Sequence, residues 1–382
     1  MDISPDHELL TDLRKELHKF PELSGNEIKT SERISGFLKE LKPDELITGL
    51  GGYGIAARFR GKEPGRRIMV RAELDALPIY ESNELGYKSL NPGVSHKCGH
   101  DGHMAVAAGV ARLFSGNRPE QGELVVLFQP AEEIGRGAHS VINDRRFSAI
   151  EPDYVLAMHN LPGYGLNEII LRKEAFAAAS EGMIVNLKGR TSHAGEPENG
   201  ISPAAAMSHI LNKLPELPRD SKFKNYTLAT VIHARLGEIA FGTSPGEAVI
   251  MATLRAFDEN EMELLKTGAV GLVHDIARKE KLGVSVDWTE KFPLTANDPF
   301  IVSLAGEIAS RLGYRTVNLE SAFRWSEDFG WFTRKYRGML FGIGAGIDHP
   351  DLHNPDYDFP DEIISTGVRL IGEICRELLN TD

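Results

Sequence analysis

The sequence of 382 residues is poor in cysteine and contains no long apolar run. Cys98 and Cys375 alone cannot build a disulfide framework, which favours a reducing, cytoplasmic compartment. The first residues, MDISPDHELL, lack the basic and apolar regions of a secretory signal, so we expect none. Crossing a bilayer takes ~20 apolar residues in succession, and no segment approaches that length, so we expect no membrane span.

Positive charge is also in the minority. The chain has 43 Lys and Arg against 55 Asp and Glu, which gives a formal net charge of −12. Broad nucleic-acid binding needs a basic surface, and docking on anionic lipid needs clustered basic residues. We therefore expect neither nucleic acid nor a membrane among the partners. The hydrophobic content of 41% is typical of a globular protein long enough for two domains.

Most of the chain alternates short apolar runs with amphipathic stretches. This alternation predicts an α/β domain with a mostly parallel central sheet. The predicted strands are 53–59, 67–72, 123–128, 153–158 and 338–345, and the predicted helices are 6–19, 30–41, 102–115, 299–312 and 361–379.

The pattern changes near residue 180. A strand at 181–189 is followed by a helix at 202–214, strands at 226–236 and 247–257, a helix at 259–281 and a strand at 283–288. This βαββαβ order is that of a ferredoxin-like unit. We therefore expect an inserted domain at 180–290 that interrupts an α/β domain formed by residues 1–179 and 291–382.

Side chains that bind metals or move protons follow several predicted strands. They are Glu73 and Asp75, Glu132 and Glu133, His159, and His349 and His353, with Cys98 and His100 just before the helix at 102–115. In an open α/β sheet, ligands bind outside the carboxyl ends of the strands. Convergence of these side chains at one sheet edge predicts a metal site.

The types of donor atom limit which metal ions this site could bind. A thiolate and an imidazole from Cys98 and His100, turned toward one ion by Gly99, suit Zn²⁺, and carboxylates add room for Mn²⁺. Glu132 and Glu133 would point opposite ways in an extended segment. One would then bind metal, and the other would take a proton from water whose pKa the metal lowers.

Six motifs in order then resemble a known family. They are VRAELDALPI (70–79), HKCGHDGHMA (96–105), FQPAEE (128–133), AMHNLPG (157–163), SHAGEP (192–197) and LHNPDYDF (352–359). Together they resemble the M20 metallopeptidase family, and within it the amidohydrolases of N-acyl amino acids, such as hippurate and auxin-conjugate hydrolases.

The resemblance implies a role for each motif residue. The implied metal ligands are Cys98, His100, Glu133, His159 and His353. Glu132 is implied as general base, and Asp75 as the buried carboxylate that orients the metal ligands. His193 resembles the histidine of the dimerisation (lid) domain that reaches across a homodimer to the tetrahedral oxyanion. Arg255 is the candidate for binding the substrate carboxylate.

The expected activity is hydrolysis of the amide bond of N-acyl amino acids, with Zn²⁺ or Mn²⁺ as one or two ions per subunit. Two alternatives remain: a dipeptidase- or carboxypeptidase-like metallo-exopeptidase on the same fold, and an inactive relative that binds metal or a metabolite.

We assign no role to His18, prefer His353 to His349 as a ligand, and treat Glu73 as a tolerated replacement for the family's aspartate. For Asp101 we expect helix capping.

Overall fold

The computed structural model describes residues 4–380, and the chain divides into two compact units. Unit 1 contains the described residues through Phe176, then Thr295–Ala322, and those from Glu327 onward. Unit 2 contains Ala177–Leu294 together with Phe323–Ser326. The short segment joins unit 2 because the carbonyls of Phe323 and Trp325 accept hydrogen bonds from the Ala178 N–H. The sequence pattern did not predict that residues 323–326 would belong to unit 2.

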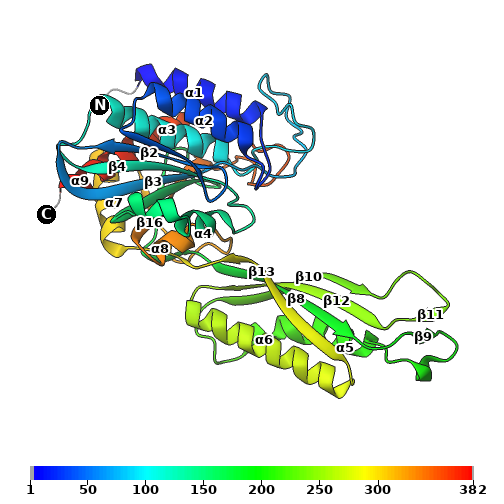
Figure 1. Cartoon of the computed structure of the whole chain (residues 1–382). Coiled ribbons are helices and arrows are strands. Elements are labelled where there is room, and N and C mark those ends of the chain that lie inside the picture. The colour runs from blue at the N-terminus through cyan, green and yellow to red at the C-terminus, as the bar shows by residue number, and fades with distance from the viewer. Residues whose placement is uncertain (1–3, 381–382) are drawn as a thin grey trace. The chain divides into compact units, whose positions relative to one another are not determined.

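Unit 1 is built on a sheet with the strand order β1-β2-β4-β3-β5-β16-β6-β15 within the described residues (Figure 1). Its strands are β1 (Glu45–Leu50), β2 (Gly54–Arg60), β3 (Glu63–Glu73), β4 (Gln121–Gln129), β5 (Tyr154–Pro162), β6 (Ile169–Leu171), β15 (Thr316–Asn318) and β16 (Arg337–Gly346).

The expectation of a mostly parallel sheet needs correction, because the sheet is mixed. The middle strands β4, β3, β5 and β16 are parallel to one another, and β6 is parallel to β15. The pairs β1-β2, β2-β4 and β6-β16 are antiparallel. The short strands β1, β6 and β15 were not predicted, because segments of three to six residues give little periodicity.

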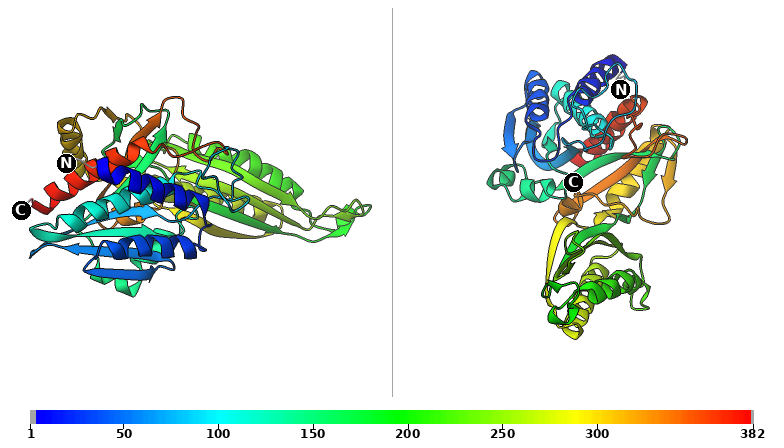
Figure 2. Two further views of the ribbon diagram at one scale, coloured as in Figure 1. Left: turned by 90° about the horizontal axis from the view of Figure 1, so that it is seen from above. Right: turned by 90° about the vertical axis from the view of Figure 1, so that its right-hand side faces the viewer.

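Helices cover both faces of this sheet (Figures 1 and 2). On one face lie α1 (Ser4–Lys19), α2 (Ile28–Glu40), α3 (His100–Gly116), α7 (Pro299–Arg311) and α9 (Glu362–Asn380). They share a core with alternate strand residues, such as Ile68 and Val70 of β3. The short α4 (Gly137–Ile142) and α8 (Gly330–Thr333), with the 3₁₀ turn Arg145–Ala149, pack on the opposite face.

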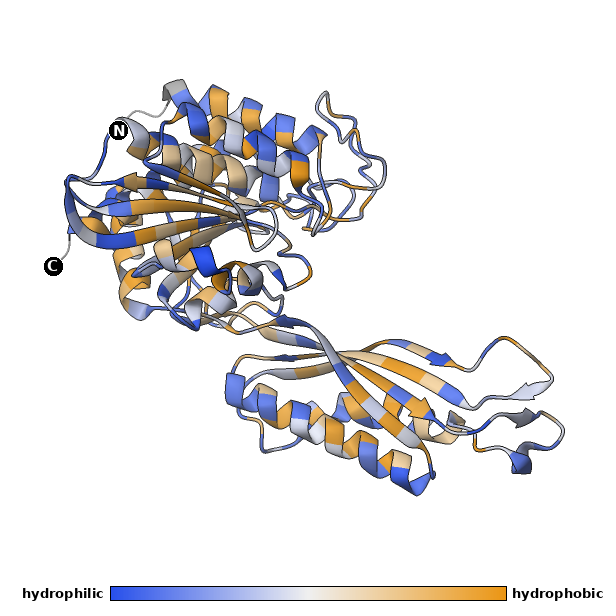
Figure 3. Cartoon of the chain, viewed as in Figure 1, coloured by the Kyte–Doolittle hydropathy of each residue, from blue (hydrophilic) through white to orange (hydrophobic). Residues whose placement is uncertain are grey.

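The middle strands are buried on both faces, which explains their sequences. All residues from Gly122 to Gln129 of β4 and from Tyr154 to Leu161 of β5 are buried. Strands covered on both faces read as continuous apolar runs, and Figure 3 shows them coloured as hydrophobic. Polar side chains are therefore expected mainly where the strands end.

Unit 2 contains a four-stranded antiparallel sheet in the order β10-β12-β8-β13. Along the chain, its elements are β8 (Ala179–Lys188), α5 (Ala204–Lys213), β10 (Thr227–Leu236), β12 (Glu247–Ala256), α6 (Glu259–Lys279) and β13 (Gly283–Phe292). Burial alternates strictly along β12, because one face packs on the two helices.

Smaller elements complete the chain. The strands β7 (Glu174–Ala177) and β14 (Thr295–Asn297) pair with each other, as do β9 (Ser192–His193) and β11 (Thr243–Ser244); 3₁₀ turns cover Pro197–Asn199 and Leu214–Arg219. Within residues 4–380, no helix combines the length and apolarity needed to span a membrane.

Candidate metal centre

The strands of unit 1 deliver the candidate ligands to one place. Asp75 follows β3, Glu132 and Glu133 follow β4, and His159 lies on β5. Cys98 precedes α3, and His100 is its first residue. The parallel strands end at the same edge of the sheet, so side chains from distant parts of the sequence meet there.

The distances link all five candidate ligands. Cys98 Sγ lies 3.6 Å from His159 Nε2. Glu133 Oε1 lies 3.7 Å from His100 Nε2 and 3.9 Å from His353 Nε2. One donor atom each from Cys98, Glu133 and His353 lies within 4.8 Å of the other two. These separations suit atoms that share a metal ion, whose bonds to N, O and S are about 2.0–2.3 Å.

Two buried polar atoms of this cluster lack hydrogen-bond partners, which bears on whether a metal ion fits between them. His100 Nε2 and Glu133 Oε1 are both buried and have no hydrogen-bond partner among the described residues. Buried polar atoms of this kind are normally satisfied, so each requires a specific explanation. A cation between them satisfies both, and the thiol, imidazole and carboxylate donors match a divalent transition metal.

Gly99 turns the chain between two of the candidate ligands. Its φ of +88° lies in the left-handed region, where a side chain is strained. A Cβ at this position would also lie 2.5 Å from Asn160 Oδ1. Only glycine fits this turn, which brings Cys98 and His100 to the same cluster although they are two residues apart.

Asp75 organises the ligands through backbone groups. Its carboxylate accepts hydrogen bonds from the N–H groups of Glu132 at 3.1 Å and Glu133 at 3.0 Å, and from Ser24 Oγ at 2.6 Å. Its carbonyl oxygen lies 2.8 Å from His100 Nδ1. That contact shows that Nδ1 carries a proton, and it turns Nε2 toward the cluster.

His159 is oriented in the same manner. Its Nδ1 lies 2.8 Å from the Asn160 carbonyl oxygen, so Nδ1 carries the proton and Nε2 faces Cys98. Burial lowers the pKa of His159 to about 3, with a further contribution from His103. The imidazole is therefore neutral, which is the form that binds a metal.

The prediction that Glu132 and Glu133 point opposite ways is wrong. They lie in a turn after β4, because Asp75 binds both of their N–H groups, and the preceding Ala131 has a φ of +53°. Both carboxylates lie within 4.0 Å of His100 Nε2. Their roles must therefore be separated by their other partners rather than by direction.

Those partners include an acidic pair that sequence reasoning missed, Glu327 and Asp328. The Asp328 N–H donates to Glu132 Oε1 at 3.2 Å. Both acidic side chains are buried and bind the fully buried Arg71, at 3.0 Å and 2.5 Å. The available signal was weak: two adjacent acids placed before the apolar run 329–332, in a sequence with several other adjacent acidic pairs.

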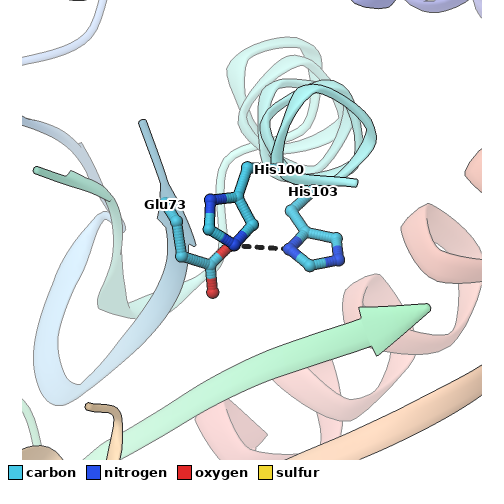
Figure 4. Close-up of side chains that lie close together, drawn as sticks. All are labelled: Glu73, His100 and His103. Carbon is cyan, nitrogen blue, oxygen red and sulfur yellow. Dashed lines mark hydrogen bonds and ion pairs between the residues drawn. The ribbon is translucent and has the colours of Figure 1, made fainter. Parts of the chain in front are cut away.

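Glu73 also has a larger role than its description as tolerated. It is fully buried, ion-paired with Arg71, and its Oε2 lies 2.7 Å from His103 Nδ1. Figure 4 shows His100 and His103 beside this carboxylate, with a dashed line joining Glu73 and His103. One carboxylate oxygen of Glu73 thus lies within 4.8 Å of a ring nitrogen of the candidate ligand His100, so the charge of Glu73 acts on the cluster.

Burial and mutual repulsion shift the carboxyl groups. Burial, with the nearby charges of Glu327 and Glu133, raises the pKa of Glu132 well above its usual value. Burial also raises the pKa of Glu133, to about 7, although His100 opposes the shift. Burying this many negatively charged carboxylates lowers the stability of the fold unless cations neutralise them. Arg71 supplies one positive charge. A divalent cation would supply two more.

Other predicted residues lie apart from this cluster. His349 Nε2 hydrogen-bonds the Asp358 carbonyl oxygen at 2.6 Å, and its ring packs edge-on against Tyr357. Asp101 does not cap α3, since Gly99 occupies that position; its carboxylate binds His18 at 2.8 Å and Arg14 at 3.5 Å instead. His18, assigned no role, is thus part of a buried ion network.

The two candidates from the inserted segment lie in unit 2. His193 is exposed on β9, paired with Thr243 of β11, and its Nδ1 accepts a hydrogen bond from the Gly195 N–H at 3.0 Å. Arg255 is half-buried on β12, and its Nη1 donates to the Arg324 carbonyl oxygen and to Ser326 Oγ.

Residues 69–377 match the model of peptidase family M20/M25/M40, and the chain belongs to this family. It is therefore an M20-type amidohydrolase, a hydrolytic enzyme that acts on amide bonds. It is 29% identical to an N-acetylcysteine deacetylase of Bacillus subtilis over 377 residues, which cover 98% of both chains. It is 28% identical to a hippurate hydrolase of Campylobacter jejuni, over 96% of both chains.

The fold is likewise that of solved M20 structures. A Bacillus subtilis protein described as a dinuclear metal-binding peptidase of the M20 family superposes with a TM-score of 0.86. The two chains are covered completely and are 26% identical. The mixed α/β architecture of this chain is therefore the M20 fold.

Proposed function

We propose that this chain cleaves the amide bond of N-acyl amino acids, or related acyl conjugates, to a carboxylic acid and an amino acid. The observation that carries the proposal is the meeting of Cys98, Glu133 and His353 within 4.8 Å, beside the second carboxylate Glu132. The names of the relatives, a deacetylase of N-acetylcysteine and a hydrolase of hippurate, support the substrate class.

We assign Zn²⁺ or Mn²⁺, as one or two ions per subunit, to Cys98, His100, Glu133, His159 and His353. Such an ion, when bound, polarises a carbonyl group and lowers the pKa of water. Mutual contacts of these side chains, and the unpartnered His100 Nε2 and Glu133 Oε1, support this assignment.

Glu132 is the proposed general base. The Asp328 N–H holds its Oε1, while its Oε2 lies 4.0 Å from His100 Nε2, on the ligand side. Glu132 is almost completely buried, and its pKa is raised, so it holds a proton more readily than an exposed glutamate does. This suits a group that takes a proton from water and delivers it to the leaving amine.

We further propose that residues 180–290 form a dimerisation (lid) domain in a cytoplasmic homodimer. His193 would stabilise the oxyanion in the site of the partner subunit. Because the Gly195 N–H occupies Nδ1, the proton of neutral His193 lies on Nε2, which is then a hydrogen-bond donor. Arg255 would bind the carboxylate of the substrate.

The central test is a panel of substrates on protein loaded with Zn²⁺ or Mn²⁺. N-acetyl and N-benzoyl amino acids should be hydrolysed, and free dipeptides should not. Hydrolysis of the dipeptides alone would favour a metallo-exopeptidase. Metal binding without turnover of any amide would favour an inactive relative and contradict the proposal.

The role of His193 has its own test, because it joins two subunits. Glu132→Gln and His193→Ala proteins, each inactive, are mixed under conditions that exchange subunits. If His193 serves the partner's site, random pairing restores about a quarter of the sites. If His193 serves its own subunit, or if no dimer forms, mixing restores no activity.

A further inference from the structure

Lys97 is a fully buried lysine placed immediately before the candidate ligand Cys98. Its ammonium group donates to Glu81 Oε1 at 2.8 Å. Glu81 is held in turn by His18 Nε2, at 2.9 Å, and by the Ser89 N–H, at 2.8 Å. The position of the ammonium group is therefore fixed by partners that are themselves fixed.

Lys97 also binds both ends of the segment 353–357. Its carbonyl oxygen accepts a hydrogen bond from the His353 N–H at 2.7 Å, and its ammonium group donates to the Tyr357 carbonyl oxygen at 2.7 Å. These two contacts join segments that are about 260 residues apart in sequence. They place His353 next to Cys98.

His353 needs such support, because its backbone has a φ of +66°. A residue with a Cβ persists in this left-handed conformation only where the surroundings hold it. Its side chain is about half exposed, so packing alone restrains it little. The hydrogen bond from its own N–H to Lys97 is thus a direct restraint on its orientation.

The other end of the segment is tied to a further ligand. Tyr357 is fully buried, and its hydroxyl accepts a hydrogen bond from Asn160 Nδ2. The carbonyl oxygen of Asn160 is the acceptor for His159 Nδ1. Three hydrogen bonds therefore connect Lys97, Tyr357, Asn160 and His159 in turn, each made by a different group of the residues that they share.

We propose that Lys97, anchored by Glu81, is a positioning residue that fixes His353 relative to Cys98 and His159 for metal binding. The inference rests on the proposed metal centre. A buried ion pair is by itself weak evidence of a stabilising role. Here the Lys97 ammonium group also binds the Tyr357 carbonyl oxygen, and the Lys97 backbone carbonyl binds the N–H of His353, the one candidate ligand with an exposed side chain. Groups that orient metal ligands typically contribute 10–100-fold to metal affinity.

The test substitutes Lys97→Met, which keeps an unbranched side chain only one atom shorter and removes its donors. Mn²⁺ and Zn²⁺ affinities are measured by competition with a chelator, and the number of ions bound at saturation is counted. We expect an affinity 10–100-fold lower than that of the unsubstituted protein, with turnover recovering as metal is raised. Lys88→Met is the matched control, because it removes an exposed ion pair with Glu84 from the same loop.

Unchanged affinity in Lys97→Met, with wild-type protein that binds metal, overturns the inference and leaves the proposed function intact. Wild-type protein that binds no metal contradicts the proposed function itself. If Lys97→Met fails to fold, Glu81→Gln replaces it, because this variant keeps the shape of the anchor and removes its charge. It should lower affinity in the same direction by a smaller factor, and an unchanged value overturns the inference.

Discussion

Asp75 Oδ2 accepts a hydrogen bond from the Glu133 N–H at 3.0 Å, so a fully buried carboxylate fixes the backbone of a candidate ligand. The second oxygen of the same carboxylate accepts a hydrogen bond from the preceding N–H of the turn, that of Glu132. One residue thereby sets the direction of both glutamates. The candidate metal centre depends on such backbone contacts as much as on its donor atoms.

Asp75→Asn should lower metal affinity by about 10–100-fold. An asparagine offers one acceptor oxygen in place of two, so its amide N–H₂ must face one of the two backbone N–H groups. Chelator competition measures the effect. Ser24→Ala is the control, because it removes another hydrogen bond to Asp75 and leaves the turn bound; an equal loss in both variants would contradict the explanation.

Glu132→Gln should retain metal and fold but lose about 10²–10⁴-fold in kcat. Glutamine keeps the acceptor for the Asp328 N–H, yet it cannot take up a proton. Steady-state kinetics with metal analysis of the same sample checks both parts. Near-normal turnover in the metal-loaded variant would remove Glu132 from the role of general base.

Gly99→Ala should destabilise the protein by about 1–3 kcal/mol and weaken metal binding. The added Cβ meets Asn160 at 2.5 Å in a backbone conformation that disfavours side chains. Gly36→Ala, in open space within α2, should instead stabilise by up to about 1 kcal/mol. Urea unfolding separates the two, and similar effects of both substitutions would show that the turn at Gly99 is not constrained.

Arg71→Met should cost about 3–5 kcal/mol, because it leaves Glu73, Glu327 and Asp328 without their buried guanidinium partner. Lys62→Met is the control. It breaks an exposed ion pair with Glu120, and such pairs contribute at most about 1 kcal/mol. The free energies of unfolding in urea compare the two, and a small loss in Arg71→Met would mean that the acids become protonated at little cost.

His18 should make stability depend on pH. Burial alone lowers its pKa, but Asp101 and Glu81 outweigh burial and raise the pKa from 6.5 to about 9. A raised folded-state pKa contributes stability that is complete below about pH 6.5 and is lost as the pH rises through about 9. The difference corresponds to about 3 kcal/mol.

The unfolding free energy of the wild type minus that of His18→Gln, measured from pH 6 to pH 10, should therefore fall with rising pH. Most of the fall should lie between pH 6.5 and 9. His209→Gln, on the exposed side of α5, is the control and should show no such trend. A flat difference for His18 would mean that the imidazole is neutral in the folded protein.

The sequence by itself determined the α/β class and the positions of most long elements. Buried middle strands such as β4 and β5 must be apolar along their whole length, so their pattern is readable without neighbours. It also singled out Cys98 and the pair Glu132 and Glu133, because ligands of an open α/β sheet bind at the carboxyl ends of its strands. The choice of Glu133 as the ligand of that pair came from the resemblance to the M20 family. Strand hydrophobicity and the spacing of metal donors in a motif are local properties, so the amino-acid sequence alone is enough to recognise them.

The tertiary structure decided what depends on contacts between distant segments. The antiparallel flanks of the sheet, the common direction of Glu132 and Glu133, and the burial of Glu327 beside Arg71 follow from such contacts. The same holds for the contact of Lys97 with His353, two residues that no local pattern relates. A hydrogen bond or ion pair acts over a few ångströms in space, and separation along the chain carries no information about that distance.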